Sequence, residues 1–316
     1  MICSAPGKVI IAGEHSVVHG TPAIVTTISL NTRIELHHNH NNFFKINLEN
    51  EDILIEADDF QQFLSVTKQK FPVFNEIHDN LDMFEAVKNG FSMRVESDIP
   101  MSAGLGSSAT LCACLVNLFV TRQENGQGAK KQDLLQFSKQ LEGFFHSIPS
   151  GIDTTAAIQG GAFLFQKGEI IDAIPQGFTM NGDLIVVNSG IPRNTGRMVD
   201  KVGTLLAKKP DYTKERFDKI ASIVLSIWKL LKSETVDVRS FGKLLLRNQE
   251  CLVDVGVSIG QIDDIIDTGL RLGATGGKLT GAGGGGCVTL ACPSRKSSNL
   301  IKTFQGQGLE AFKVKM

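Results

Sequence analysis

The chain has 316 residues, of which 42% are hydrophobic, so it is long enough for one large or two ordinary domains, and two is the better expectation. Its 32 basic and 33 acidic residues leave a formal net charge of −1. This balance excludes a general electrostatic attraction to nucleic acid or to an anionic membrane, so any anion must be held by a local site.

The cysteines and the apolar runs indicate the compartment. Six cysteines show no C-x-x-C pair and no regular spacing, which is typical of reduced, buried thiols in an intracellular protein. Residues 1–11 lack a long apolar run and carry Lys8 in their middle, so a secretory signal is not expected. The best apolar run, 111–120, is far shorter than the roughly 20 residues that span a bilayer. We expect a soluble, cytoplasmic protein with no membrane or nucleic-acid partner.

The first half of the chain is predicted to be rich in strands, because β-type or alternating segments are separated by turn residues. The predicted strands are 8–12, 23–27, 32–37, 43–48 and 91–97. A glycine-rich stretch follows the last of them and leads into a helix over 108–122. A polar surface loop, 124–131, then precedes a second helix over 132–146.

Helical periodicity dominates after residue 182. A short buried strand, 184–187, precedes predicted helices over 197–208, 214–232, 238–255 and 261–272. Two strands, 278–280 and 287–291, flank a glycine loop like the arms of a hairpin, and a helix (298–305) and a strand (311–314) follow. We place a domain boundary near residue 180, which gives domains 1–181 and 182–316.

The stretch 99–109 is the most informative in the chain, because it has the composition of a phosphate cradle that opens a helix. Its glycines and serines let backbone N–H groups approach an anion closely. A Walker A loop is excluded, since Leu279 follows Gly277-Lys278 where Ser or Thr is required. An ordinary helix start with Ser107 or Ser108 as the N-cap is the simpler alternative.

Two segments match the dinucleotide pattern G-x-G-x-x-[GA], but neither has the context of a Rossmann unit. The first match is 104–109. A Rossmann unit should have a second strand and an acidic residue after it, but the polar loop lies there instead. The second match, 281–286, runs into a strand instead of a helix.

Two further segments accompany the cradle. The first places a cation just before a strand and is Ser4-Ala5-Pro6-Gly7-Lys8, followed by Gly13-Glu14-His15-Ser16-Val17-Val18-His19-Gly20. The second is Lys278-Leu279-Thr280-Gly281-Ala282-Gly283-Gly284-Gly285-Gly286-Cys287. In this order and at these separations the three segments resemble the GHMP kinase family, which includes galactokinases, homoserine kinases, mevalonate kinases and phosphomevalonate kinases. The resemblance extends to 142–161 and 191–195, and two of the segments look most like the mevalonate kinase branch.

The resemblance implies a fold of two α+β domains, an N-terminal ribosomal-S5-domain-2-like domain and a C-terminal ferredoxin-like domain, with the active site between them. It also implies an ATP- and Mg²⁺-dependent kinase that transfers the γ-phosphoryl group to the 5-hydroxyl of mevalonate, a small-molecule substrate. Oligomeric state is not readable from the sequence, and a homodimer is one state that the family allows.

The resemblance assigns a role to each site residue. ATP phosphates would be bound by Lys8, Ser97, Ser102, Ala103, Gly104, Leu105, Gly106, Ser107 and Ser108. The metal ligands would be Ser108 and Glu142, since Mg²⁺ prefers oxygen ligands. Asp153 would take the proton from the hydroxyl, and Lys8 would stabilise the alkoxide and the transferring phosphate. The substrate would be bound by Glu14, His15, Asp153, Thr195 (with Arg193) and Ala282.

The same residues also have simpler interpretations. Asp153 alone would be a first-turn aspartate that stabilises a helix, Lys8 a solvated lysine, and Glu14 and His15 turn residues. Ser102 departs from the family pattern, which usually has glycine at that position. Another family activity, such as a phosphomevalonate kinase or a mevalonate 3-kinase, and a catalytically silent sensor of nucleotide and metabolite are the alternatives to the proposed activity.

Two other patterns are interpreted as structural. Asp263-Asp264-Ile265-Ile266-Asp267 has the form of a prenyl-synthase metal motif, but without a second aspartate-rich site a solvated helix face is the better interpretation. His37-His38-Asn39-His40 has no carboxylate or cysteine ligands arranged around it and is interpreted as a polar hairpin tip.

Overall fold

The computed structural model describes residues 1–39, 41–49, 52–71, 73–74, 89–100, 103–120, 130–143 and 151–316. The chain divides into two compact units, each assembled from separate segments. Unit 1 comprises Met1–Gly7, Leu30–Ile99 and Gly106–Ile158, and unit 2 comprises Lys8–Ser29, Pro100–Leu105 and Gln159–Met316. Strands β1 (Ile2–Ala12) and β2 (Ala23–His38) therefore each contribute to both units.

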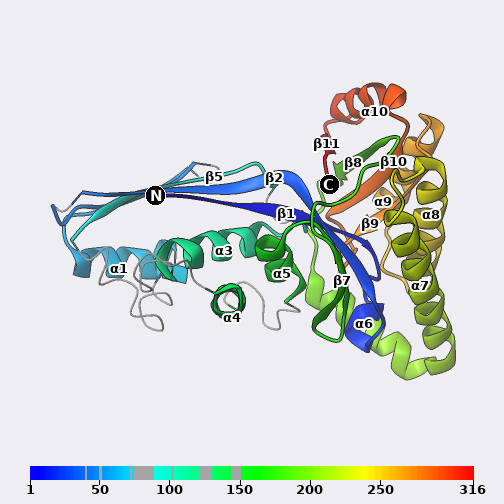
Figure 1. Cartoon of the computed structure of the whole chain (residues 1–316), viewed down its shortest axis with the longest axis horizontal. Helices are drawn as coiled ribbons and strands as arrows, with labels where there is room; N and C mark the ends of the chain where they lie inside the picture. Colours follow the sequence, from blue (N-terminus) through cyan, green and yellow to red (C-terminus); the bar gives the residue numbers. More distant parts are fainter. Residues whose placement is uncertain are drawn as a thin grey trace. The chain divides into compact units, whose positions relative to one another are not determined.

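Unit 1 is a sheet with helices on one face (Figure 1). Its strands have the order β4-β3-β5-β2, with β3 and β5 parallel and the other neighbours antiparallel. The strands besides β1 and β2 are β3 (Phe44–Leu48), β4 (Ile53–Ala57) and β5 (Phe91–Ser97). The helices are α1 (Phe60–Lys70), α3 (Ser107–Val120), α4 (Lys131–Glu142) and α5 (Ile152–Gln159).

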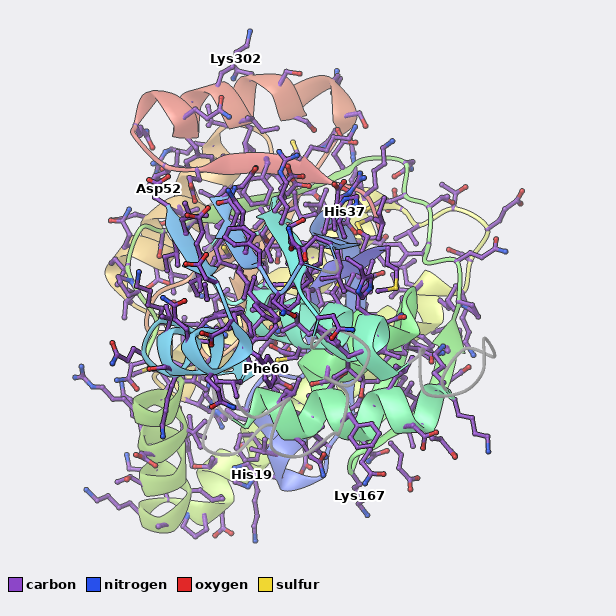
Figure 2. The ribbon with its side chains drawn as sticks, turned by 90° about the vertical axis from the view of Figure 1, so that its left-hand side faces the viewer. His19, His37, Asp52, Phe60, Lys167 and Lys302 are labelled. Atoms are coloured by element: carbon purple, nitrogen blue, oxygen red, sulfur yellow. The ribbon has the colours of Figure 1, made fainter. Side chains whose placement is uncertain are left out.

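The core of unit 1 is built from phenylalanines where the sheet meets α1. Phe44 stacks on Phe63 with ring centroids 5.0 Å apart and meets Phe91 edge-on at 5.5 Å. Phe60, labelled at the start of α1 in Figure 2, lies 5.7 Å from Phe44. Such aromatic pairs stabilise a core beyond the area they bury, so this cluster holds α1 on the sheet.

Unit 2 contains a four-stranded antiparallel sheet with the order β11-β8-β10-β9. Helices α8 and α9 pack against β9 and β10, and α10 packs against β8 and β11 (Figure 1). The strands are β8 (Asp183–Asn188), β9 (Gly276–Thr280), β10 (Cys287–Cys292) and β11 (Ala311–Val314). The helices are α6 (Thr195–Lys208), α7 (Pro210–Leu231), α8 (Val238–Asp254), α9 (Gly260–Arg271) and α10 (Ser294–Gly306).

Unit 2 also holds the first part of β2, which pairs with β6 (Ala162–Gln166), and β6 pairs in turn with β7 (Glu169–Ile174). A short 3-10 helix, η1 (Ser16–His19), lies between β1 and β2. His19, labelled in Figure 2, stacks on Phe217 of α7 with ring centroids 4.9 Å apart.

Most of the predicted elements are confirmed. The helices and strands predicted after residue 182 are all present, and β9 and β10 form the expected hairpin, with Cys287 opposite Thr280. Helix α7 begins earlier than predicted because Pro210 suits the first turn of a helix, where its missing N–H costs nothing. Asp264 and Asp267 are exposed on α9, as a solvated helix face requires.

Two predictions for the first half are wrong. The predicted strands 23–27 and 32–37 are one strand, β2, because the residues between them stay extended and hydrogen-bonded, as in the bond from Ser29 N to Lys315 O. The histidine segment is not a hairpin tip, because β5 lies between β2 and β3 in the sheet. His40 and most of the predicted loop 124–131 lie outside the described residues.

The strands β4, β6 and β7 and the helix α1 were not predicted from the sequence. Within the described part of the chain, no helix combines the length and the apolar character that a membrane span requires.

Candidate active site

The cradle ends where α3 begins, in unit 1. The backbone N–H of Thr110 donates to Gly106 O over 3.0 Å, so Gly106, with φ of +87°, takes the N-cap position. Ser107 and Ser108 are therefore the first two residues of the helix, and neither is the N-cap. Both are half-buried. A 14-residue helix that starts with two hydroxyl-bearing residues, and whose first N–H groups point out of its end, suits an anion.

A chain of hydroxyl groups fixes this helix start to the sheet of unit 1. Ser97 on β5 lies 3.0 Å from the Thr32 hydroxyl on β2, which lies 2.7 Å from the Thr110 hydroxyl. Thr110 also donates to Ser107 O over 2.8 Å. Ser97 thus reaches the cradle through Thr32 and Thr110, two buried residues that sequence reasoning missed because isolated threonines carry no motif.

The two predicted acidic residues of unit 1 are brought together by their helices. Glu142 ends α4 and is buried, and its Oε2 accepts a short hydrogen bond from the hydroxyl of Thr154. Asp153 precedes Thr154 in the first turn of α5 and is half-buried. The contact between Glu142 and Thr154 therefore holds the end of α4 against the start of α5, with Asp153 next to it.

Glu142 also lies near the cradle helix. Its negative charge, together with burial as the larger effect, raises the pKa of the Cys112 thiol on α3. Cys112 is four residues after Ser108, so the two share a face of α3. A buried carboxylate and a hydroxyl near one helix face form the hard oxygen set that Mg²⁺ takes, together with phosphate oxygens. Among the described residues no group of three or more His, Cys, Asp or Glu side chains could hold a metal by itself.

In unit 2, Lys8 lies in the middle of β1 and not just before a strand as predicted. Its side chain is 2% exposed, so the interpretation as a solvated lysine is wrong. Its backbone N–H donates to Leu105 O over 2.8 Å, which joins β1 to the cradle segment 103–105. Ala103 and Leu105 are both buried, whereas Ser102 lies outside the described residues.

Glu14 and Lys278 form an ion pair in the interior of unit 2. Their side chains are 1% and 0% exposed, and Lys278 Nζ donates to Glu14 Oε1 and to two backbone carbonyls, those of Ile10 and Leu279. The Nδ2 of Asn248 on α8 donates to Glu14 Oε2 over 3.3 Å. Burial lowers the pKa of Lys278, and the Glu14 carboxylate opposes that effect. Sequence reasoning missed Lys278 and Asn248 in this pairing.

His15 connects the end of β1 to the glycine loop. Its Nε2–H donates to Ala282 O over 2.8 Å, which leaves Nδ1 as an acceptor. Burial lowers the pKa of His15, so the ring is neutral near pH 7. Its backbone has a φ of 60° and its side chain makes no cap hydrogen bond, so the side chain does not serve a turn. Two predicted substrate residues, His15 and Ala282, are therefore in direct contact.

The glycine loop 281–286 lies close to Arg193 and to the cradle segment of unit 2. A Cβ on Gly281 would lie 2.9 Å from Arg193 Nη1, and one on Gly104 would lie 2.8 Å from the same atom. A Cβ on Gly286 would lie 3.1 Å from Ala103 O. Within the loop, a Cβ on Gly285 would lie 2.4 Å from Ile191 O, a backbone atom that cannot move aside easily. The loop is therefore packed against neighbouring backbone, which excludes the flexible-linker interpretation.

Thr195 begins α6 and is exposed, and the preceding Asn194 is the N-cap, with its Oδ1 accepting from Arg197 N over 2.9 Å. The predicted Arg-Asn-Thr segment therefore combines a guanidinium, a cap and an exposed hydroxyl.

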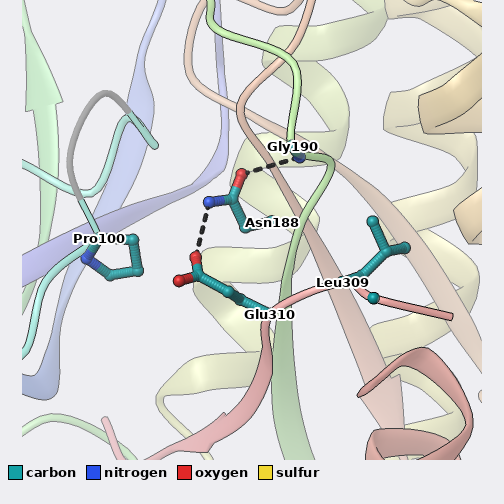
Figure 3. A pocket seen from close by; sticks show the side chains of 6 residues that line it. Pro100, Asn188, Gly190, Leu309 and Glu310 are labelled. Atoms are coloured by element: carbon teal, nitrogen blue, oxygen red, sulfur yellow. Dashed lines mark hydrogen bonds between the residues drawn. The ribbon is translucent and has the colours of Figure 1, made fainter. Parts of the chain in front are cut away.

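A cavity of about 340 Å³ lies beside Pro100, the residue at the start of the cradle segment of unit 2 (Figure 3). Its polar lining is internally paired, because Asn188 Nδ2 donates to Glu310 Oε2 over 2.8 Å and Gly190 N donates to Asn188 Oδ1 over 3.2 Å. This pairing fixes the orientation of the Asn188 amide and the Glu310 carboxylate at the wall of the cavity.

Comparison with known proteins identifies the class. A family model described as the GHMP kinases N terminal domain matches residues 71–161, and one described as GHMP kinases C terminal matches residues 228–305. The chain belongs to the GHMP kinase family, which confirms the expected mixed α/β, two-domain kinase fold.

Within this family, mevalonate kinases are among the similar proteins. The chain is 32% identical to the mevalonate kinase of Archaeoglobus fulgidus, over 91% of each protein. The crystal structure of Methanococcus jannaschii mevalonate kinase matches with a TM-score of 0.84 and 27% identity, covering 100% of this chain and 98% of that one. L. major mevalonate kinase in complex with R-mevalonate matches with a TM-score of 0.79 and 25% identity, over 99% and 95% of the two chains.

Proposed function

We propose that this protein is an ATP-dependent mevalonate kinase, which transfers the γ-phosphoryl group of ATP to the 5-hydroxyl of mevalonate. The observation that carries the proposal is similarity to mevalonate kinases along almost the whole chain, including one solved with R-mevalonate. The arrangement of the predicted site residues within each unit supports it.

Phosphate binding is proposed for the start of α3 and for the cradle segment. Backbone N–H groups after Gly106 and the hydroxyls of Ser107 and Ser108 would bind phosphate oxygens, and the Ser97-Thr32-Thr110 chain would hold them in place. Ser108 and Glu142 would hold Mg²⁺. When bound, that ion neutralises phosphate charge and orients the γ-phosphoryl group.

Proton removal is proposed for Asp153 and charge stabilisation for Lys8. Asp153 would accept the proton of the substrate hydroxyl, and the ammonium of Lys8 would stabilise the alkoxide. Burial of Lys8 supports this role, because a charge in a site with little water acts more strongly than a solvated one. His15 and Ala282, which are hydrogen-bonded to each other, would shape the substrate pocket with Glu14 and Thr195.

The decisive test measures ADP release by the purified protein with R-mevalonate, 5-phosphomevalonate, galactose and homoserine, with and without Mg²⁺. We expect kcat/KM for mevalonate to exceed that for each other alcohol by at least about 100-fold, since hydrogen-bonding sites discriminate strongly. Phosphorus NMR of the product should place the phosphate on the 5-hydroxyl.

Phosphate on the 3-hydroxyl, or faster turnover of another alcohol, would assign a different family activity. Binding of ATP without turnover of any of the four would instead support the sensor alternative. The same proposal includes a cytoplasmic location, ATP and mevalonate as the bound small molecules, and a homodimer. Sedimentation velocity would measure the oligomeric state.

A further inference from the structure

The backbone of unit 2 turns sharply at His15, between β1 and η1. The N–H of Ser16 donates to Glu14 O over 2.7 Å, and His15 between them has a φ of 60° and a ψ of −48°. These values define a γ-turn with positive φ, which is rare and strained for a residue that has a Cβ. Gly13, just before the turn, packs so closely on β2 that a Cβ would lie 2.5 Å from Ala23 Cα. Such strain persists only where the surrounding structure fixes the backbone.

Two side chains fix the turn. The His15 ring donates to Ala282 O over 2.8 Å. The Glu14 carboxylate accepts from Lys278 Nζ through Oε1 and from Asn248 Nδ2, over 3.3 Å, through Oε2. The Glu14 side chain is 1% exposed and both its oxygens accept hydrogen bonds from the protein. Glu14 therefore anchors the turn and does not present its carboxylate to a ligand.

The contacts of Lys278 are complete. An ammonium group has three N–H donors, and Lys278 Nζ has three acceptors, which are Glu14 Oε1, Ile10 O and Leu279 O. The lysine side chain is 0% exposed, so no other partner from solvent reaches it. A single group therefore joins the turn to both β1 and β9, and its loss would leave the Glu14 carboxylate buried without a cation.

Stability alone explains neither the buried ion pair nor the strained turn. Apolar side chains of similar size in place of a buried ion pair are often neutral or stabilising, and backbone strain lowers stability. The two features meet in one conformation, that of His15. Its ring contacts the glycine loop through Nε2 and has Nδ1 as an acceptor, so the conformation has a chemical consequence.

We propose that Lys278 is a positioning residue for substrate binding: it holds Glu14, Glu14 holds the γ-turn, and the turn holds the His15 ring in its orientation in the substrate pocket. Asn248 supports Glu14 from the other oxygen in the same way. This role rests on the proposed function, in which His15 contributes to the mevalonate site. Lys278 acts through Glu14 and His15 and is not itself a catalytic residue.

The kinetic test compares Lys278→Met with Gln249→Met in the full chain. Gln249 is buried on α8 next to Asn248, and its Oε1 accepts from Leu279 N over 3.0 Å, so its loss weakens the same packing without removing a partner of Glu14. We expect Lys278→Met to lower kcat/KM for mevalonate by about 10²-fold, mostly through a higher KM, because a misplaced binding group has effects of this size. ATP binding should change little. Gln249→Met should keep the kcat/KM of the wild type.

A second variant separates positioning from folding. Glu14→Met combined with Lys278→Met replaces the whole ion pair with apolar side chains, which should recover stability that Lys278→Met alone loses. The double variant should still bind mevalonate as poorly as Lys278→Met, because the turn lacks its anchor. Recovery of both the free energy of unfolding and kcat/KM would overturn the proposal, since the pair would then only stabilise the fold. Wild-type kcat/KM in Lys278→Met would overturn it as well.

Nitrogen-15 NMR of the histidine rings gives a readout that needs no substrate. His15 should show one tautomer, with its proton on Nε2, in the wild type and in Gln249→Met, and a mixture of tautomers in Lys278→Met. Unchanged His15 signals in Lys278→Met would overturn the positioning role. Failure of the proposed function has a different signature: the wild type would not phosphorylate mevalonate, while the loss of the single tautomer in Lys278→Met would still support the positioning of His15 by Lys278.

Discussion

Asp153 carries two roles that its position alone does not separate. It lies in the first turn of α5, an eight-residue helix, where any carboxylate stabilises the helix dipole, and it also lies next to the Thr154–Glu142 hydrogen bond. Asp133 has the first of these roles without the second, because it lies in the first turn of α4. The two aspartates therefore form a matched pair for a mutational test.

Asp153→Asn should lower kcat by about 10²–10⁴-fold with little change in ATP binding, because the amide cannot accept the hydroxyl proton. Asp133→Asn should leave kcat unchanged and cost only about 0.3–1 kcal/mol of stability. Steady-state kinetics and nucleotide titration of both variants measure these effects. Near-normal turnover by Asp153→Asn would exclude it as the base.

His15 should make the stability of the protein depend on pH. Burial lowers its folded-state pKa below the unfolded value of 6.5, so between these two values the unfolded chain binds more protons than the folded one. The contribution of His15 to the free energy of unfolding is therefore fully present above pH 6.5 and is lost as the pH falls towards the folded pKa. The loss is at most about 1.4 kcal/mol per pH unit.

His15→Asn removes the titrating ring and keeps a residue that tolerates positive φ. We expect its free energy of unfolding to fall less than that of the wild type between about pH 7 and pH 5.5, measured by urea denaturation. His37→Asn, a change at a largely exposed histidine, should follow the wild type. Equal pH dependence of His15→Asn and wild type would show that His15 titrates normally.

The glycine loop between β9 and β10 was predicted from the sequence, but the reason why glycines are required there was not. Gly283 has a φ of +75°, and a Cβ there would lie 2.3 Å from Val257 O, the carbonyl that accepts from Gly284 N. Positive φ costs an L residue about 1–2 kcal/mol, and a backbone clash adds to it. The loop is therefore a rigid contact with the segment after α8.

Gly283→Ala should lower the free energy of unfolding by more than about 2 kcal/mol. Gly203→Ala on α6, where a Cβ would meet nothing within 4 Å, should raise it by about 0.5–1 kcal/mol. Thermal and urea unfolding of both variants compare the two glycines. A neutral Gly283→Ala would mean that the loop adapts.

Local signals explain which elements were predicted from sequence and which were not. Helices with strong periodicity, such as α8, and strands beside glycine loops, such as β9, depend on neighbouring residues and were found. The continuity of β2 and the Ser97-Thr32-Thr110 chain depend on residues far apart in the sequence. For the same reason Glu14 was found by its motif, while its partner Lys278 was interpreted only as part of another motif.

At the scale of the whole molecule, the predicted domain 182–316 differs from unit 2, which also contains residues 159–181 and the separate segments 8–29 and 100–105. Those residues supply Glu14 for the buried Lys278 and the Ile10 N–H that donates to Thr280 Oγ1 over 2.9 Å. A fragment of residues 182–316 would keep the lysine and lose its carboxylate. An uncompensated buried charge costs about 3–5 kcal/mol, a large part of the stability of a domain.

The fragment 182–316 should therefore show no cooperative thermal unfolding by circular dichroism, although its sheet and five helices are intact in sequence. Lys278→Met in the same fragment should restore stability, because it replaces the buried ammonium with an apolar side chain of similar length. Lys313→Met should not, since Lys313 is 49% exposed and pairs with Asp183 within the fragment. If the unmodified fragment unfolds cooperatively at the temperature of the full chain, the pairing of Glu14 with Lys278 does not decide where this protein can be divided.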